Sequence, residues 1–231
     1  LAVFHTPEHI ARFGSDESSP TAADSNGLFA TLPCGGLGVD SDTVWNPAST
    51  SVAARLAAGQ VMCLAYSISL GHIRNGFALV HPPGHHAEPD QAMGFCYFNS
   101  VAVAALNVLK AGLAKRVMVL DWDIHHGNGT QLATAFHSGL LYVSLHRHDG
   151  GTFFPGTGGI QDLASMKKRQ GYVVNVAWGS GCPQPTGPVD LKLRLVEKAA
   201  AEEEVDCVTV TADNKEHCTT TETAQPTQSR R

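Results

Sequence analysis

Histidine and aspartate residues gather in two short stretches of this chain. "PPGHHAE" places His85 and His86 directly after a Pro-Pro-Gly turn, and "DWDIHHGNG" contains Asp121, Asp123 and His125. Residues that alternate along an extended segment point to the same side, so the aspartates and His125 can share one face. A carboxylate and an imidazole on one face can reach the same divalent cation, and zinc accepts both kinds of ligand. The second stretch therefore predicts a site for such a cation.

The two adjacent histidines suit proton transfer better than joint metal binding. Neighbours in a tight turn cannot easily bind one ion together, but they can stand beside it as general base and acid. Each imidazole needs a hydrogen bond that fixes its other nitrogen, and Asp121 and Asn128 are plausible partners. A carboxylate raises basicity more than an amide does, so we expect the two pKa values to differ. Two alternatives stay open, namely a polar loop with a helix N-cap at Asn128, and a surface turn filled by the histidine pair.

Glycines and phenylalanines lie close to these stretches in the sequence. Gly127 and Gly129 would let the backbone turn sharply around a bound ion. Phe95 and Phe154 could form the walls of a narrow channel that suits an aliphatic chain. The alternative is that both are ordinary core phenylalanines.

Helical and strand-like segments alternate along the chain. Helical spacing predicts helices over 51–70, 100–114 (with Asn99 or Ser100 as N-cap), 129–138 and 189–204, and apolar runs predict strands over 76–81, 116–121, 140–146, 172–178 and 205–211. This alternation indicates βαβ units and a parallel sheet covered on both faces. Since ligands bind beyond the carboxyl ends of such strands, the loops after 76–81 and 116–121 should meet at one edge. Residues 1–50 are turn-rich.

Composition narrows the class of protein. The chain has 231 residues, of which 43% are apolar, so it can bury a core as one large domain or two small ones. Its net charge of −5 and lack of a Lys/Arg run argue against direct nucleic-acid binding. No apolar run reaches about 18 residues, so we expect no membrane span. Six cysteines without C-x-x-C spacing favour a reducing compartment over a disulfide framework.

Several longer motifs together resemble one known family. "HPPGHHAE", "AMGFCYFNS", "VLDWDIHHGNGTQ", "LYVSLHRHDGGTFFPGTG" and "NVAW" are similar to segments of the zinc-dependent histone deacetylases, in the same order. "LPCGGLGVDSDTVWN", the Asn of "GNG" and "FFPGTG" make the chain most similar to class IIa. The resemblance implies an arginase/deacetylase-like three-layer α/β fold with a central parallel sheet. It also implies hydrolysis of acetyl-lysine on histones or other proteins, transcriptional corepressors as partners, and a place in the nucleus and cytoplasm.

The resemblance implies particular metal ligands. Asp123 and His125 match two of the three family zinc ligands. A family potassium site matches Asp121, Asp123, His125, Ser144 and Leu145, and oxygen-rich sites suit such a hard cation. Cys34 matches one cysteine of a class IIa structural zinc site, which should be incomplete because its family partners lie N-terminal to Leu1.

The resemblance also implies catalytic and substrate-binding roles. His85 and His86 match the catalytic histidine pair, with Asp121 beside the first and Asn128 beside the second. The walls of the acyl-lysine channel and the rim carboxylate match Gly94, Phe95, Phe154 and Asp42, or alternatively Asp40.

The sequence departs from the family after residue 212. "VDCVTVTA" leads straight into Asp213-Asn214-Lys215, where the family has Gly-Phe-Asp with the third zinc ligand. Asp213 is a candidate substitute, although the loop is two residues shorter. We therefore interpret 1–212 as a partial deacetylase catalytic domain, truncated at both ends, with 213–231 as a divergent polar tail. A catalytically poor binding module that recruits corepressors, and a two-metal arginase-fold hydrolase, remain as alternatives.

Overall fold

The computed structural model describes residues 1–14, 29–33, 35–159, 170–180 and 206–207. Its helices are α1 (Pro7–Gly14), α2 (Thr50–Ser69), α3 (Ser100–Lys110) and α4 (Asn128–Ala133), with a 3-10 turn η1 (Asp149–Gly151). Its strands are β1 (Ala30–Thr31), β2 (Leu37–Gly38), β3 (Val44–Trp45), β4 (Val117–Asp121), β5 (Leu140–Arg147), β6 (Tyr172–Trp178) and β7 (Asp206–Cys207).

The larger sheet is parallel and has the order β6-β5-β4-β7. Strands β4, β5 and β6 are nearly continuous apolar runs; β4 is buried at four of its five residues, whereas β6, at the edge of the sheet, is exposed at three of its seven. This pattern is expected of strands covered on both faces, so the predicted parallel α/β architecture is confirmed. The register pairs Asp121, the last residue of β4, with Ser144 in the middle of β5, so Ser144 lies beside the carboxyl end of β4.

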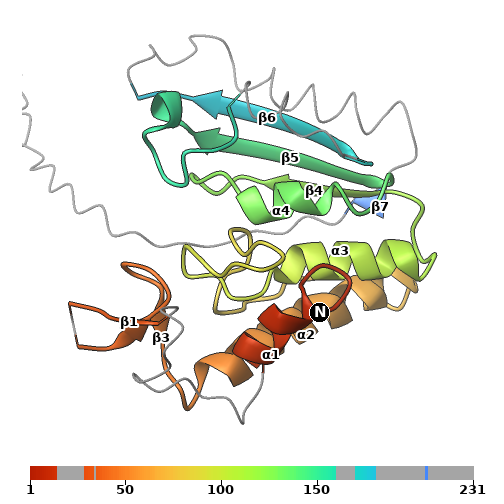
Figure 1. Ribbon diagram of the computed structural model, residues 1–231. Helices are drawn as coiled ribbons and strands as arrows, with labels where there is room; N and C mark the ends of the chain where they lie inside the picture. The colour runs from red at the N-terminus through yellow and green to blue at the C-terminus, as the bar shows by residue number, and fades with distance from the viewer. Residues whose placement is uncertain (15–28, 34, 160–169, 181–205, 208–231) are drawn as a thin grey trace, which may run out of the picture.

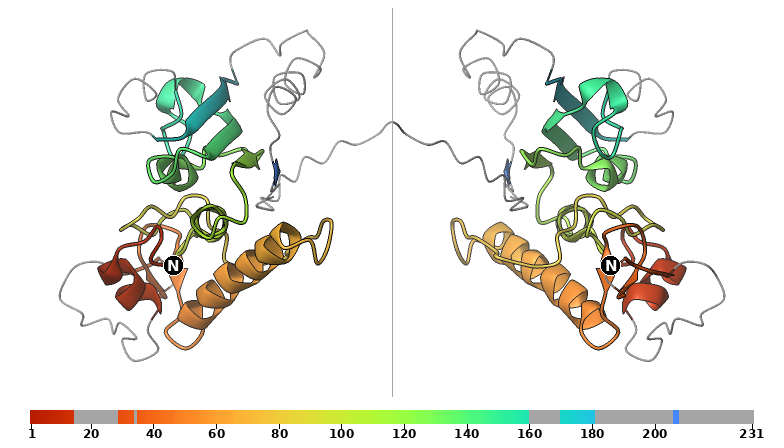
Figure 2. Two further views of the ribbon diagram at one scale, coloured as in Figure 1. Left: turned by 90° about the vertical axis from the view of Figure 1, so that its right-hand side faces the viewer. Right: turned by 90° about the vertical axis from the view of Figure 1, so that its left-hand side faces the viewer.

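Helices α2 and α3 pack together through small side chains. Both helices bury alanines, and Ala65 of α2 lies in the same core cluster as Ala102 and Ala105 of α3. Short side chains let helix axes approach closely, so α3 fits between α2 and the strands, as Figures 1 and 2 show. The buried side chains of α3 continue into those of β4 and β5 as one core cluster. The N-cap prediction is also confirmed, because the Asn99 side chain accepts a hydrogen bond from the Ala102 N–H at 3.0 Å.

One helix meets the length and composition of a membrane span. Helix α2 has 20 residues with a hydropathy of 1.3. In this structure it packs against α1 and α3 and buries Val61 and Ala65 in the core. Of its apolar window, 33% is buried inside the structure, and a single helix of this kind is weak evidence for a membrane span.

Some sequence predictions were wrong. Residues 76–81 form no strand, since they pair with none of the strands in the described part of the chain. Phe77 and Leu79 are instead 75% and 80% exposed. Helix α4 is shorter than predicted and ends at Ala133, where the Thr134 hydroxyl donates to the Gln131 carbonyl at 2.8 Å. Within 1–50, α1 and the small antiparallel sheet β1-β2-β3 were not anticipated. The predicted helix 189–204 lies outside the described residues, and of the strand 205–211 only β7 is described.

Two buried histidines near the N-terminus fasten it to the loop before α3. His5 Nδ1 lies 3.0 Å from the Glu88 carbonyl, and its Nε2 accepts the Asn99 backbone N–H at 2.9 Å. The ring of His9 stacks on that of His5 at 4.7 Å, and its Nε2 lies 2.7 Å from the Tyr97 carbonyl. Because an accepting Nε2 carries no proton, His5 is neutral. Burial, with the neighbouring His9, lowers the pKa of His5 to about 3.

This arrangement predicts that the fold loses stability in acid. The unfolded chain protonates His5 below about pH 6.5, whereas the folded chain resists protonation until about pH 3, so the free energy of unfolding falls as pH falls through this window. The loss is up to about 1.4 kcal/mol per pH unit for each such histidine. Urea unfolding between pH 7 and pH 4 measures it. His5→Gln should be less stable at pH 7 but show a shallower pH dependence; a slope equal to wild type would contradict the assignment.

Candidate active site

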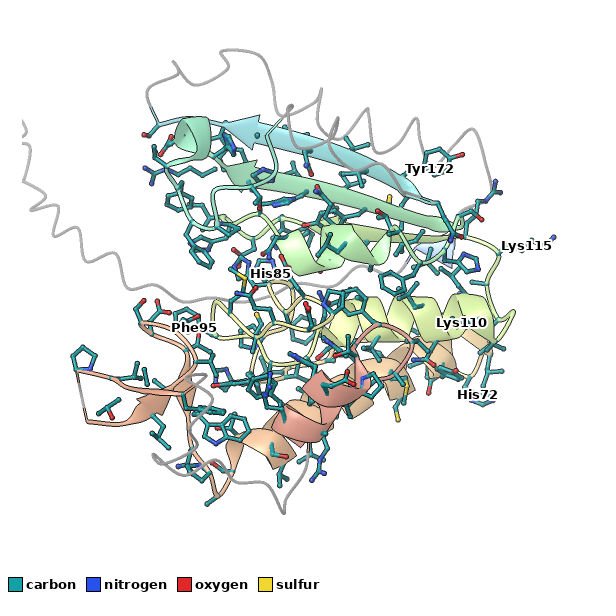
Figure 3. All side chains as sticks on the ribbon, in the orientation of Figure 1. His72, His85, Phe95, Lys110, Lys115 and Tyr172 are labelled. Carbon is teal, nitrogen blue, oxygen red and sulfur yellow. The ribbon has the colours of Figure 1, made fainter. Side chains whose placement is uncertain are left out.

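The loop that carries the histidine pair is held by backbone contacts to α3 and α4. Thr130 N–H in α4 donates to the His85 carbonyl at 3.1 Å. The Asn99 side chain donates to the Ala87 carbonyl at 3.3 Å and to the Thr130 hydroxyl at 3.1 Å. Figure 3 shows His85 in this loop, between the parallel sheet and α3. The histidines therefore lie at the carboxyl end of β4, although the segment directly before them, residues 76–81, is not a strand.

His85 is fixed by the carboxylate at the end of β4. Its Nδ1 lies 3.0 Å from Asp121 Oδ2, and the Tyr142 hydroxyl donates to the same oxygen at 2.9 Å. An ionised carboxylate only accepts, so the proton lies on Nδ1 of His85. Burial alone would lower the pKa of His85, but the charge of Asp121 outweighs it and raises that pKa. Nε2 of His85 is buried and has no hydrogen-bond partner among the described residues.

His86 is fixed by an amide whose orientation is itself determined. Its Nδ1 lies 2.9 Å from Asn128 Oδ1, and Asn128 Nδ2 donates to Glu88 Oε1 at 2.7 Å. Because the carboxylate of Glu88 can only accept, the amide oxygen must face His86, which then carries its proton on Nδ1. Burial, followed by the charge of His85, lowers the pKa of His86 to about 3. The expected difference between the two pKa values is confirmed. The pKa of His86 is, however, further below that of an ordinary imidazole than an amide partner alone would explain, because burial lowers it.

Asp123 and His125 lie together beside this pair. Along the segment, Asp121 and Asp123 are buried whereas Trp122 and Ile124 are exposed, which confirms that the acidic residues share one face. Asp123 Oδ1 accepts from the His125 backbone N–H at 2.7 Å and lies 3.1 Å from its Nδ1. The same oxygen lies 4.0 Å from Nε2 of His85.

The pKa of Asp123 fits an ionised ligand. Burial opposes ionisation, but hydrogen bonds from His125 and the charge on His85 lower the pKa of Asp123 below its ordinary value. The carboxylate therefore stays charged at neutral pH. A charged oxygen beside an imidazole is a donor set that zinc accepts.

Two phenylalanines pack against the polar cluster. Phe153 stacks on His125 with ring centroids 5.0 Å apart and an interplanar angle of 6°. Phe154 makes edge contacts with His86 at 5.0 Å and with His125 at 5.9 Å. The guanidinium of Arg147 lies 4.2 Å from the centre of the Phe153 ring. Phe154 is therefore no ordinary core residue, since it is 44% exposed and touches the imidazoles.

Known proteins are similar to this chain in sequence. The profile of the histone deacetylase domain matches residues 1–201. Histone deacetylase 7 of Homo sapiens is 44% identical over 195 residues, which are 81% of this chain and 20% of that protein. Histone deacetylase 9 of Homo sapiens is 47% identical over 223 residues, covering 92% and 22%. Histone deacetylase 4 of Caenorhabditis briggsae is 45% identical over 188 residues, covering 78% and 21%.

A solved crystal structure is also similar to this chain in fold and sequence. The crystal structure of the HDA15 HD domain matches with a TM-score of 0.62 and 46% identity, over 76% of this chain and 44% of that one. The chain belongs to the histone deacetylase family. It spans about a fifth of the length of the curated relatives named here. Its similarity to deacetylases 7, 9 and 4 supports the class IIa-like resemblance.

Some of the remaining predicted site residues lie near the histidine pair, and others lie outside the described part of the chain. Ser144 is fully buried next to Asp121, with its Oγ 2.8 Å from His146 Nδ1, and Leu145 follows it in β5. Asp42 is exposed, whereas the neighbouring Asp40 is turned inward. Cys34 and Asp213 lie outside the described residues, as does the proposed boundary after residue 212. Among the described residues, no group of three or more His, Cys, Asp or Glu is arranged to hold a metal ion.

Several residues that shape this candidate site were not predicted from the sequence. They are Thr43, Glu88, Tyr142, Phe153 and His126, and each acts through a contact with a distant segment. His126 is fully buried, with Nδ1 2.8 Å from the Thr157 hydroxyl and Nε2 3.0 Å from Gln131 Oε1. It therefore ties the loop after β4 to the loop that carries Phe153 and Phe154. Its position within the motif "HHGNG" could have indicated that His126 helps to shape the site.

The glycines beside His125 lie where two segments of the site pack closely. Gly127 has a φ of −78° and a ψ of 75°, and the Asn128 N–H donates to the His126 carbonyl at 3.0 Å, so the backbone does turn sharply there, in an inverse γ-turn whose φ does not require glycine. A Cβ on Gly127 would overlap the Asp121 carboxylate and the Tyr142 hydroxyl. A Cβ on Gly129 would overlap the Ala87 carbonyl. The two loops of the site therefore approach each other too closely for any side chain at these positions.

This packing predicts opposite effects for two helical Gly→Ala substitutions. Alanine normally stabilises a helix interior by about 1 kcal/mol relative to glycine. Gly59→Ala in α2 should follow this rule, because nothing lies within 4 Å of the new Cβ. Gly129→Ala in α4 should instead destabilise by about 1–3 kcal/mol through overlap with Ala87. Urea unfolding of both variants measures this, and stabilisation by Gly129→Ala would show that the loops are not in this contact.

Proposed function

We propose that the protein hydrolyses acetyl-lysine on histones or other proteins with the help of zinc, and so contributes to transcriptional repression. The observation that supports this best is the histidine pair. Both rings have their proton on Nδ1, held by Asp121 and by Asn128, and both lie beside Asp123 and His125. Each Nε2 is therefore available to exchange a proton with a bound substrate or water.

The described residues fit zinc in the type of their donors. Asp123 and His125 would hold the ion, which would polarise the amide carbonyl and activate water when bound. A catalytic zinc commonly has three protein ligands, and the described residues offer two. The third must come from outside them, and Asp213 is one candidate. Potassium at the set Asp121, Asp123, His125, Ser144 and Leu145 is a further part of this proposal.

The two histidines would divide the proton transfers between them. His86 is neutral at working pH, so its Nε2 can accept a proton from the attacking water. His85 is held in favour of its charged form by Asp121, so it suits stabilisation of developing negative charge and donation to the leaving amine. Phe154 beside His86, with Phe95 and Gly94, would line the path of the lysine side chain. Asp42 or Asp40 would bind the substrate backbone at the rim.

The proposed partners follow from this chemistry and from the family. They are acetylated histones or other acetyl-lysine proteins, and transcriptional corepressors, in the nucleus and cytoplasm. Cys63 and Cys96 are free, which suits a reducing compartment. The net charge of −5 gives no support to direct nucleic-acid binding.

A second candidate function is a binding module that recruits corepressors with little catalysis. The two-donor metal set among the described residues favours it, because such a set holds zinc less firmly than three ligands. Binding of an acetyl-lysine peptide without its hydrolysis would favour this second function over the first.

Zinc content tests the ligand assignment directly. His125→Ala should remove bound zinc, because it deletes one of the two described donors. His72→Ala is the matched control, since His72 is an exposed histidine far from His85 (Figure 3) and should leave zinc content unchanged. Native mass spectrometry of the purified proteins gives the stoichiometry. Full zinc in His125→Ala would show that the ligands are others.

Hydrolysis tests the roles of the two histidines. On acetyl-lysine and trifluoroacetyl-lysine peptides, at matched zinc content, His86→Ala should lower kcat by about 100-fold or more, as expected when a general base is lost. His85→Ala should lose less, and His72→Ala should behave as wild type. Equal, small decreases in kcat for His86→Ala and His85→Ala would contradict this division of roles. Peptide binding without turnover by zinc-loaded wild type would favour the binding module.

A further inference from the structure

The channel residue Phe95 has an unusual backbone conformation. Its φ is +67°, and that of Gly94 before it is +55°. Glycine adopts this region freely, but a phenylalanine rarely does. Such a conformation persists only where surrounding contacts impose it. The turn is closed locally by two backbone hydrogen bonds between Met93 and Cys96, at 2.9 and 3.1 Å.

The additional contacts come from a segment fifty residues earlier in the chain. Thr43 Oγ1 accepts the Phe95 backbone N–H at 2.9 Å and donates to Asp40 Oδ2 at 2.8 Å. Asp40 Oδ2 also accepts the Gly94 N–H at 3.3 Å, and its Oδ1 accepts the Thr43 N–H at 2.6 Å. Both backbone N–H groups of the unusual turn are therefore satisfied by two side chains.

Thr43 is well suited to hold this turn. Its side chain is fully buried, and its single hydroxyl serves as donor and acceptor at once. The Tyr97 hydroxyl donates to the Val44 carbonyl at 2.6 Å and so fixes the same segment from the other side of the turn. Although burial alone would raise it, hydrogen bonds from Thr43 and Asp42 lower the pKa of Asp40, which keeps its carboxylate an acceptor.

The position of the turn also affects the histidine pair. A Cβ on Gly94 would lie 2.5 Å from Cδ2 of His86, so the backbone of the turn packs directly against that ring. A shift of the turn would move one wall of the channel and disturb the surface on which His86 rests. Figure 3 shows Phe95 in the loop region on the same side as the small sheet and close to His85.

We propose that Thr43, together with Asp40, is a positioning residue that holds the Gly94–Phe95 turn in place and thereby determines how well the site accepts an acyl-lysine side chain. The inference rests on the proposed function, since it assigns Phe95 to the substrate channel. Thr43 touches no substrate in this role, because it acts through the backbone of Phe95.

The matched substitutions are Thr43→Val and Thr43→Ser. Valine has the shape of threonine but can neither accept from Phe95 nor donate to Asp40, whereas serine keeps the hydroxyl. Residue-resolved amide hydrogen exchange by NMR reports on the turn without any need for activity. In Thr43→Val, exchange at Phe95 should rise about tenfold, as the loss of one buried hydrogen bond implies, while Thr43→Ser stays near wild type. Unchanged exchange in Thr43→Val would overturn the proposed hold on the turn.

Peptide affinity tests the consequence for the substrate. Fluorescence anisotropy with a labelled acetyl-lysine peptide gives Kd, and turnover gives kcat where it is measurable. Thr43→Val should weaken binding about tenfold with a smaller change in kcat, and Thr43→Ser should restore it. Faster exchange at Phe95 with unchanged Kd would overturn the positioning role. Wild type that binds no peptide would refute the proposed function itself, and the channel inference with it, whereas the exchange result would still decide whether Thr43 holds the turn.

Discussion

The Asp121 carboxylate is the point on which the site depends. One oxygen accepts from the Tyr142 hydroxyl and lies 3.0 Å from His85, and the other accepts from the backbone N–H of Asp123. A buried carboxylate costs free energy unless such partners compensate it. These contacts bring together β4, β5 and the histidine loop. The position of His85 beside Asp123 is therefore coupled to the packing of the parallel sheet.

The polar cluster is otherwise held by contacts that leave little freedom. Asn128 is oriented by Glu88, His126 is fixed by Thr157 and Gln131, and Phe153 stacks on His125. Each side chain has its hydrogen-bonding atoms or its ring face assigned by a neighbour from another segment. Such preorganisation lets an active site stabilise charge without rearranging during the reaction. The close approach of these segments also explains why glycines are required at 127 and 129, where a Cβ would overlap a neighbouring segment.

Much of this arrangement could be predicted from local sequence. The periodicity of 51–70 and 100–114 identified α2 and α3, and the apolar runs identified β4, β5 and β6, because burial on one or both faces leaves a visible pattern. The partners of His85 and His86 followed from the chemistry of "DWDIHHGNG". Residues 76–81 show the limit of this reasoning, since an apolar run contains no information on whether a neighbouring strand is present. Thr43 and Glu88 show another limit, because their roles arise only from contacts 52 and 40 residues away.

The central claim is that Asp121 and Asn128 fix both histidines with the proton on Nδ1 and leave Nε2 for chemistry. Nitrogen-15 NMR of the histidine side chains across a pH titration measures this most directly. We expect neutral His86 to carry its proton on Nδ1, and His85 to take up its second proton at a higher pH than His86 does. A neutral His86 protonated on Nε2, or a His86 that becomes charged before His85, would contradict it.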